Sequence, residues 1–342
     1  MLLQTGQTIC YDEQGRELDC RETLQDGRFR HGLTWPRPRF QVAEQLVTDR
    51  LTDLVWPQDA NLGEFPQTWS EALQAVAQMN RDQMLGHADW RLPNRREMRS
   101  LLSYQAKRPA LAKDHPFVNV VHGWYWTSTT AAINPAYAWY VHLEGARMFY
   151  GRKDQYFLMW PVRAGDGSRL FQTGQNRCYD PDGLEIHCNG SGQDGDVRFG
   201  QTWPSPRFVV GPETVRDELT GLYWPVHADL TGRPGTWSDA LRAVAQLRKS
   251  RFAGRDDWRL PNINELESLV DCATHSPALP LGHPFHHLGE GYWSSTTSFF
   301  ETDWAWVLYL RKGALGVGFK RNPDFLVWPV AGTPASFSGL PR

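Results

Sequence analysis

Hydrophobic and polar positions first follow the period of a helix. After Thr68, apolar side chains fall at the i, i+3, i+4, i+7 spacing of one helix face, at Trp69, Ala72, Leu73 and Val76. Thr68 is a suitable N-cap, and Glu71 at the third helical position completes a capping box. The same pattern returns after Thr236, at Trp237, Ala240, Leu241 and Val244. Both stretches are therefore predicted to be amphipathic helices.

The six residues Asp-Trp-Arg-Leu-Pro-Asn occur twice, at 89–94 and at 257–262. Proline biases the preceding leucine toward the extended region, and the following asparagine is a helix N-cap. The motif therefore predicts a joint between a strand and a second helix, with the tryptophan and leucine facing inward. Arg91 and Arg259 face the other way. A structural ion pair or a carbonyl clamp explains them better than a ligand contact.

The last third of each half follows the period of a strand. Trp139, Val141 and Leu143 alternate with more polar residues up to Gly145, and residues 306–313 repeat this pattern. Such alternation ending at glycine predicts a strand that enters a hairpin, with the returning strand ending in Trp-Pro-Val. Two helices and a mainly antiparallel sheet with long loops indicate an α+β fold.

The chain is an internal repeat. An offset of 168 residues aligns it with itself almost from end to end: TWSEALQAVAQ (68–78) meets TWSDALRAVAQ (236–246), and YWTSTT (125–130) meets YWSSTT (292–297) at an offset of 167. Two tandem domains are predicted, at residues 1–165 and 169–332. The Gly-rich segment 164–169 is the predicted linker, and residues 333–342 form a tail.

Composition and charge narrow the classes of function. A net charge of -2 gives no global field toward nucleic acid, and no apolar run reaches the length of a membrane helix. The N-terminus is too short and too polar for a signal peptide, so the protein is cytosolic or a signal has been removed. Aromatic residues make up 13% of the chain, which favours a loop-rich fold with rings in an irregular core.

The spacing of the cysteines indicates the type of cellular compartment. Cys10 and Cys20 enclose nine residues, as do Cys178 and Cys188. A disulfide across each loop is favoured over zinc, because no second Cys or His pair recurs nearby. Disulfides would indicate an oxidising compartment. Cys272 has no partner and is interpreted as a buried structural thiol rather than a nucleophile.

No repeated catalytic triad, carboxylate pair or metal-ligand cluster is present, so we expect neither an enzyme nor a cofactor. His115 and His283 lie beside Pro and Phe and are interpreted as turn residues. The hydroxyls of TSTT and SSTT are better explained by bonds to the backbone. The Gln-Asp-Gly segments with Asp26, Asp194 and Asp196 fit a turn better than a calcium site.

These motifs resemble one bacterial family. TGQ-x-x-CYD, LT-x-L-x-W, TW-x-x-AL, WRLPN, YW-[ST]-STT, AW and a closing WPV occur in this order in both repeats. The order is similar to the family that includes the C-terminal domain of a bacterial collagen-like adhesin. The resemblance implies a C-type-lectin-like fold in each repeat, shared with formylglycine-generating enzymes and with variable receptors of diversity-generating retroelements. It also implies a secreted, periplasmic or cell-surface location and binding of sulfated glycosaminoglycans.

The Glu-Pro-Asn and Trp-Asn-Asp motifs of calcium-dependent lectins are absent, and so is the reactive cysteine pair of formylglycine-generating enzymes.

We therefore expect a non-enzymatic binding protein for a glycan or protein ligand on a cell surface. Alternatives are a protein-binding variable receptor, an envelope structural component or, less favoured, a relative of formylglycine-generating enzymes. In this fold the ligand face is expected on the C-terminal strands and loops, where Arg152-Lys153 and Lys320-Arg321 align at an offset of 168 as basic pairs near aromatics. A solvated strand edge is the competing explanation. The candidate ligand-binding residues are Tyr137, Tyr140, His142, Arg147, Tyr150, Arg152 and Lys153 in the first repeat, and Phe300, Trp304, Tyr309, Arg311, Lys312, Lys320 and Arg321 in the second.

Overall fold

A computed structural model describes residues 1–165 and 169–334. It divides the chain into two compact units, whose boundaries differ from those of the sequence repeats. The first unit consists of Trp35–Thr202 together with Asp271–Thr274, and the second combines Met1–Thr34 with Trp203–Val270 and the chain from His275 onward. Each unit thus takes about 34 residues from the segment that begins the other repeat. Part of the predicted linker and most of the predicted tail lie outside the described residues.

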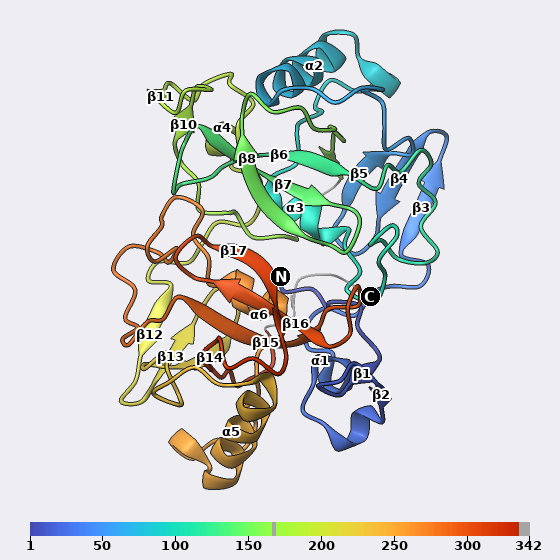
Figure 1. The fold of residues 1–342 in the computed structure, drawn as a ribbon. Coiled ribbons are helices and arrows are strands. Elements are labelled where there is room, and N and C mark those ends of the chain that lie inside the picture. Colours follow the sequence, from blue (N-terminus) through green and yellow to red (C-terminus); the bar gives the residue numbers. More distant parts are fainter. Residues whose placement is uncertain (166–168, 335–342) are drawn as a thin grey trace, which may run out of the picture. The chain divides into compact units, whose positions relative to one another are not determined.

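The first unit is built on two antiparallel sheets (Figure 1). One has the strand order β3-β4-β5-β9, with bounds Phe40–Ala43, Leu46–Asp49, Leu54–Pro57 and Arg163–Ala164. The other contains β6 (Trp124–Thr130), β7 (Tyr137–His142) and β8 (Met148–Arg152), paired in chain order. The helices are α2 (Trp69–Arg81) and α3 (Arg95–Ser100), with a 3-10 turn, η2, at Met84–Gly86. Residues 169–202 add β10 (Cys178–Tyr179), β11 (Glu185–Ile186) and the one-turn helix α4 (Asp194–Val197).

The second unit repeats most of this arrangement, but an isolated bridge between Tyr223 and Ala331 stands where the first unit has β9. Its sheets are β12-β13-β14, at Phe208–Val210, Thr214–Asp217 and Leu222–Pro225, and β15-β16-β17, at Gly291–Thr297, Trp304–Tyr309 and Ala314–Phe319. Its helices are α5 (Trp237–Ser250) and α6 (Ile263–Ser268), with η3 at Phe252–Gly254. Residues 1–34 contribute β1 (Cys10–Tyr11), β2 (Glu17–Leu18), η1 (Cys20–Glu22) and α1 (Asp26–Phe29). The predicted α+β class and the two-copy organisation are confirmed.

The predicted helix starts are confirmed in atomic detail. Thr68 and Glu71 form the capping box of α2, and Thr236 and Asp239 form that of α5. Trp69, Ala72 and Val76 are buried along one face of α2, as are their counterparts on α5. A hydroxyl that accepts from the third helical N–H satisfies a backbone donor that would otherwise have no intrahelical partner, which is why these helices begin where they do.

The Asp-Trp-Arg-Leu-Pro-Asn segment is confirmed as a joint, although it is an extended segment with a single backbone bridge and not a full strand. Arg91 pairs with Val162, and Asn94 then caps α3. Trp90 and Leu92 are buried, as predicted. The Arg91 guanidinium forms a buried ion pair with Glu97, the same glutamate that completes the α3 capping box. The structural interpretation of this arginine is therefore confirmed, and Arg259 with Glu265 repeats it.

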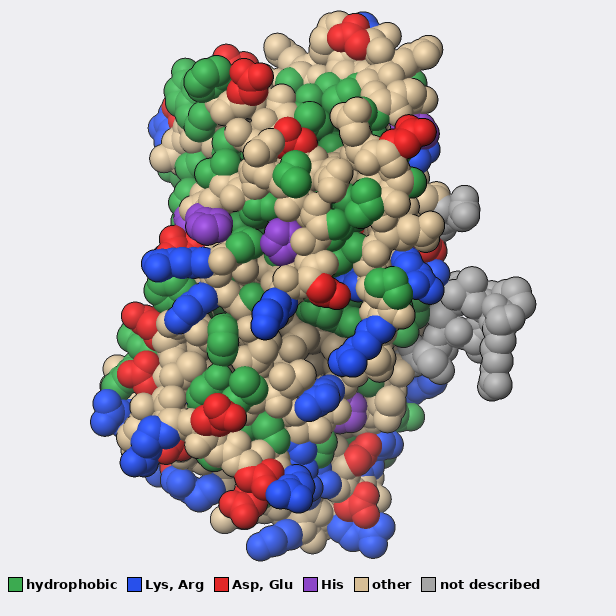
Figure 2. All heavy atoms as spheres, turned by 90° about the vertical axis from the view of Figure 1, so that its right-hand side faces the viewer, with side chains coloured by type: hydrophobic (Ala, Val, Ile, Leu, Met, Phe, Trp, Pro, Cys, Tyr) green, Lys and Arg blue, Asp and Glu red, His purple; other side chains and the backbone are tan. Residues whose placement is uncertain are grey.

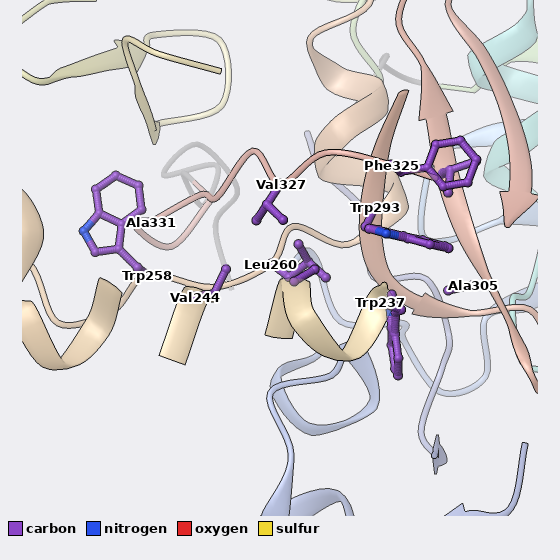
Figure 3. Close-up of a cluster of buried hydrophobic side chains, with 11 residues drawn as sticks. Trp237, Val244, Trp258, Leu260, Trp293, Ala305, Phe325, Val327 and Ala331 are labelled. Carbon is purple, nitrogen blue, oxygen red and sulfur yellow. The ribbon is translucent and has the colours of Figure 1, made fainter. Parts of the chain in front are cut away.

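Tryptophans fill the cores. In the second unit, Trp237, Trp258 and Trp293 pack with Leu260 and Phe325 in one buried cluster (Figure 3). The indole N–H of Trp237 donates to the Ser294 carbonyl at 2.7 Å, so the ring is buried without an orphaned donor. A matching cluster around Trp69 and Trp126 forms the core of the first unit. The aromatic excess of the sequence is therefore largely structural.

One strand prediction is wrong. The strands that return from the hairpins, β8 and β17, end at Arg152 and Phe319, before the Trp-Pro-Val segments. Trp160 instead lies fully buried in the following extended segment, with its ring 5.4 Å from that of Trp56. A turn follows each strand directly, at residues 153–154 and 320–321, so the sheet ends well before the Trp-Pro-Val segment.

The hydroxyl and histidine motifs have the predicted structural roles. Thr127 donates to the Trp139 carbonyl at 2.8 Å, and Ser294 donates to the Trp306 carbonyl at the same distance. Both hydroxyls lie where the strand register shifts, after Trp126 in β6 and after Trp293 in β15, and each satisfies a carbonyl of the neighbouring strand. His115 stacks on Phe117, and burial lowers the pKa of the histidine.

No helix in the described part of the chain is long and apolar enough to cross a membrane.

Candidate functional site

The lysines of the two predicted basic pairs lie in the protein interior. Lys153 is 1% exposed and Lys320 is completely buried. The Lys153 amine lies 4.1 Å from the Trp69 ring centre and donates to the carbonyls of Tyr179 and Asp180 at 3.1 and 3.2 Å. Lys320 makes the equivalent contacts with the Trp237 ring and the carbonyls of Tyr11 and Asp12. Burial lowers the pKa of each amine to about 7. Neither lysine can contact a ligand at the surface.

The strand pairing also corrects the alignment of these pairs. Tyr137 lies opposite Arg152 in the β7–β8 pair, and Trp304 lies opposite Phe319 in the β16–β17 pair. Arg152 therefore corresponds to Phe319, and Lys153 to Lys320, at an offset of 167 rather than 168. One extra residue enters the second repeat after this point, since Phe157 and Phe325 bridge the equivalent positions Gln67 and Gly235. The sequence alignment was shifted by one residue in this region, and only that shift made the two basic pairs coincide.

The sheet of the first unit brings three other candidates together around a residue that the sequence did not single out. The Trp124 ring lies 4.4 Å from the rings of Tyr140 and His142 and 6.4 Å from that of Phe149, and the Arg147 guanidinium lies 5.9 Å from it. Side chains on neighbouring strands at these paired positions share one face of the sheet. We refer to Trp124, Tyr140, His142, Arg147 and Phe149 as the Trp124 cluster.

The Trp124 cluster is partly open to solvent. Phe149 is 44% exposed, Arg147 is exposed, Trp124 and Tyr140 are half-buried, and His142 lies beneath them. Exposed rings that are held rigidly by other rings are unusual for a surface without a ligand, because burial of their apolar area would be favourable. The cluster therefore has the composition of a recognition surface, with flat apolar faces beside a cation.

Electrostatics at the cluster follow from burial. Burial lowers the pKa of His142 and raises the pKa of Tyr140, so both rings are neutral at pH 7. The His142 Nδ1 lies 3.0 Å from both the backbone nitrogen and the carbonyl oxygen of Glu144, so this ring nitrogen is engaged by the backbone. The Glu144 carboxylate is paired with Arg108, whose Nε lies 2.6 Å away. That pairing offsets the negative charge of Glu144, which also interacts electrostatically with Arg147.

Three first-repeat candidates lie elsewhere. Tyr137 and Tyr150 pack edge to face at 6.0 Å on the opposite face of the hairpin, with Tyr150 also against Trp139. Arg152 is exposed and forms an ion pair with Asp154 at 2.9 Å. Strand alternation separates these side chains from the Trp124 cluster.

The second-repeat candidates do not form an equivalent cluster. Trp304 and Phe319 pack at 5.6 Å, and the Arg321 guanidinium lies 4.8 Å from the Phe319 ring. Tyr309 packs against the core residue Phe325, and Phe300, Arg311 and Lys312 are exposed in loops. Figure 2 shows one face of the molecule, on which Lys and Arg side chains are interspersed with Asp and Glu side chains, so a single basic field does not cover that face.

The pairing register shows what replaces the Trp124 cluster in the second repeat. Trp124 corresponds to Gly291, Tyr140 to Val307 and Phe149 to Gly316, because each pair occupies the same place in its sheet. The sequence held a signal for this site: Trp124 directly precedes the matched YWTSTT motif, and glycine stands at that place in the other repeat. Only the place of His142 keeps a ring in the second repeat, Tyr309, so the exposed rings of the cluster are a feature of the first repeat and not of the shared core.

A groove lies between α2 and Tyr156, apart from the residues of the Trp124 cluster. It has a volume of about 560 Å³ and is lined by Gln74, Gln78 and Arg81 on the helix and by Tyr156 opposite them. Tyr156 is 64% exposed, whereas Arg81 is engaged by the Gln78 side chain at 2.9 Å. In the second repeat Asp324 takes the place of Tyr156. The lining of this groove includes one aromatic ring, and its arginine is already hydrogen-bonded to Gln78. The groove therefore serves as a control site in binding tests of the Trp124 cluster.

Both predicted disulfides are present, between Cys10 and Cys20 and between Cys178 and Cys188, with S–S distances of 2.04 and 2.10 Å. They indicate an oxidising, non-cytoplasmic environment. Cys272 is buried and takes part in neither disulfide, as predicted. Among residues 1–165 and 169–334, no group of three or more His, Cys, Asp or Glu side chains is arranged to hold a metal ion.

Comparison with protein-family models finds the same family in both copies. The model of the Lcl C-terminal domain matches residues 45–163 and again residues 213–331, which together are more than half of the chain. The chain belongs to the Lcl C-terminal domain family. The two Lcl C-terminal domains begin within the β3–β4 turn and within its counterpart, and each ends one residue after Trp-Pro-Val. A comparison with curated proteins finds no match to this chain.

The Lcl C-terminal domain matches exclude residues 1–34 and 169–202, the two segments that carry the disulfides and the Gln-Asp-Gly motifs. The Trp124 cluster, in contrast, lies wholly inside the first match. The candidate site is therefore a local elaboration of one family domain.

Proposed function

We propose that this protein is a non-enzymatic extracellular binding protein and that the Trp124 cluster of its first repeat binds an anionic glycan. The carrying observation is the partly exposed group of rings beside the Arg147 guanidinium, which the second repeat lacks because Gly291, Val307 and Gly316 replace three of its rings. The aromatic faces would stack on the apolar faces of sugar rings, and the guanidinium would pair with sulfate or carboxylate. The resemblance to the domain of a collagen-like adhesin supports the same ligand class.

The neutral state of His142 defines its part in this proposal. Its Nδ1 is engaged by the backbone of Glu144, so the uncharged ring would contribute an aromatic face rather than a charge. Charge recognition then depends mainly on Arg147. Binding should weaken as salt concentration rises, because an exposed guanidinium is screened by counterions.

The test is binding of sulfated heparin oligosaccharides by calorimetry over a series of salt concentrations. Phe149→Ser and Arg147→Gln change exposed side chains, and each should weaken binding about tenfold, the effect of one lost stacking or charge-assisted contact. Trp124→Ala should remove binding, with the fold checked by near-UV circular dichroism. Arg311→Gln is the matched control, since it removes one exposed positive charge from a loop of the second repeat.

Three results would reject the proposal. Equal weakening by Arg147→Gln and Arg311→Gln would mean diffuse charge attraction. Loss of binding in Tyr156→Ala, with Trp124→Ala unaffected, would move the site to the α2 groove. Absence of retention on any anionic glycan, together with capture of a specific envelope or host protein, would replace the glycan by a protein ligand.

A further inference from the structure

Each compact unit is completed by a segment from outside its family-matched domain. We call residues 1–34 the first clasp and residues 169–202 the second clasp. The first clasp belongs to the unit built on the second repeat, whereas the second clasp belongs to the unit built on the first repeat. The second clasp follows its unit directly in the chain, but the first clasp packs with residues that begin at position 203.

Specific side chains hold the first clasp. The Asp26 carboxylate is buried and accepts from Thr296 at 2.7 Å. The Gln7 side-chain amide pairs with both backbone groups of Thr297, donating to its carbonyl and accepting from its N–H at 2.9 Å. Lys320 donates to the carbonyls that follow Cys10 in the chain. These groups are buried when the clasp is in place, so the hydrogen bonds between them are shielded from competing water.

The second clasp is held by the same chemistry. Asp194 accepts from Thr129 at 2.7 Å, and Gln175 pairs with both backbone groups of Thr130 at 2.7 and 3.0 Å. Lys153 takes the place of Lys320. The two docking surfaces therefore present equivalent groups at equivalent positions, and they recognise a type of segment rather than one tethered copy.

A clasp also holds itself together. In the first clasp the Cys10–Cys20 disulfide closes the β1–β2 hairpin, and the Gln25 side chain bonds the N–H and the carbonyl of Tyr11 at 3.0 and 2.9 Å. Leu3 and Leu33 form a backbone bridge, so the two ends of the clasp lie together. Thr34, where the clasp meets the rest of the chain, is exposed. Such a segment can leave and return as one piece.

We propose that the first clasp is exchangeable: the docking surface around Thr296, Thr297 and Lys320 accepts residues 1–34 from a second copy of this chain. Two copies that trade first clasps become linked by contacts identical to those within one copy, which is the low-cost route to association through exchange of an identical element. The covalent connection gives the cis arrangement a high effective concentration, so exchange should increase with protein concentration. This inference does not depend on the ligand of the Trp124 cluster.

The test uses the full chain with a specific protease site inserted between Thr34 and Trp35. After cleavage, residues 1–34 should remain bound during gel filtration. An excess of fluorescent peptide 1–34 with its disulfide intact should then replace them. Peptides carrying Asp26→Ala or Gln7→Ala should bind at least about tenfold more weakly, since each loses buried hydrogen bonds. Glu22→Ala, a change at an exposed acidic residue of the same clasp, should bind like the unchanged peptide.

The uncut chain gives the second readout. Isotope-labelled and unlabelled copies, mixed at high concentration, should form mixed dimers detectable by native mass spectrometry. The proposal is overturned if cleaved residues 1–34 dissociate and no peptide rebinds, or if Asp26→Ala and Gln7→Ala peptides exchange as well as the unchanged one. It is also overturned if mixed dimers fail to form over times at which the cleaved protein exchanges its peptide.

Discussion

The Thr296 hydroxyl donates a hydrogen bond to the Asp26 carboxylate at 2.7 Å, across 270 positions of sequence. Thr5 donates to the same oxygen at the same distance, and Asp194 is held in the same way by Thr129 and Thr173. Both carboxyl groups are buried, and burial raises the pKa of each to about 6. The hydrogen bonds from the hydroxyls oppose this shift without cancelling it.

Because the pKa of Asp26 and Asp194 is higher in the folded than in the unfolded state, their contribution to stability is complete below about pH 4 and is lost as pH rises through about 6. The loss is on the order of 3 kcal/mol per carboxyl. Asp26→Asn and Asp194→Asn should flatten this part of the pH profile. Urea unfolding at pH 4 and pH 6.5 measures the difference between wild type and variant. A difference that does not change with pH would contradict the shifted pKa values.

The ion pair between Arg259 and Glu265 should be essential to its joint. Arg259→Met leaves the Glu265 carboxylate buried without its charge partner, so we expect a loss of about 3–5 kcal/mol in the free energy of unfolding. Denaturant titration gives this value. Arg251→Met, which breaks an exposed ion pair with Asp256 at 3.7 Å, is the control and should cost less than about 1 kcal/mol. Similar losses in both variants would show that burial is not the cause.

Each disulfide should add about 3 kcal/mol, because it closes a short loop and restricts the unfolded chain. Replacing Cys10 and Cys20 by serine should lower the melting temperature and destabilise the first clasp, whereas Cys272→Ser leaves both bridges intact. Calorimetry with and without reductant makes the comparison. If reductant lowers the melting temperature of the variant lacking Cys10 and Cys20 as much as that of the wild type, the Cys10–Cys20 bridge adds no stability.

Lysine reactivity should separate the interior lysines from the surface ones. The lowered pKa of Lys153 and Lys320 would favour acylation at pH 8, but their burial should protect them, so exposed Lys312 should react at least about tenfold faster. Peptide mass spectrometry after brief treatment with an amine-acylating reagent measures the rates. Equal rates in the native protein would place these amines at the surface, and unfolding in urea should equalise them.

The sequence by itself determined the features that depend on near neighbours. The capping boxes at Thr68 and Asn94 and the two disulfides join residues within about ten positions, so spacing and residue type were sufficient to predict them. The sequence also indicated a structural role for Arg91, but it left an ion pair and a carbonyl clamp open, and the structure shows the ion pair with Glu97. The repeat itself was visible because two copies of one scaffold retain the same residues.

Tertiary structure decided what depends on distant partners. Contacts such as the one between Gln7 and Thr297, 290 residues apart, determine which unit each clasp completes. The local sequence pattern cannot predict such distant partners. The burial of Lys153 and Lys320 depends on a Trp ring and on carbonyls from another segment, so composition alone placed them wrongly on the surface. The Trp124 cluster exists only because strand pairing sets Trp124 opposite His142 and Tyr140 opposite Phe149. A shift of one residue would turn those rings to the other face, and that register is fixed by the packed sheet rather than by any short stretch of sequence.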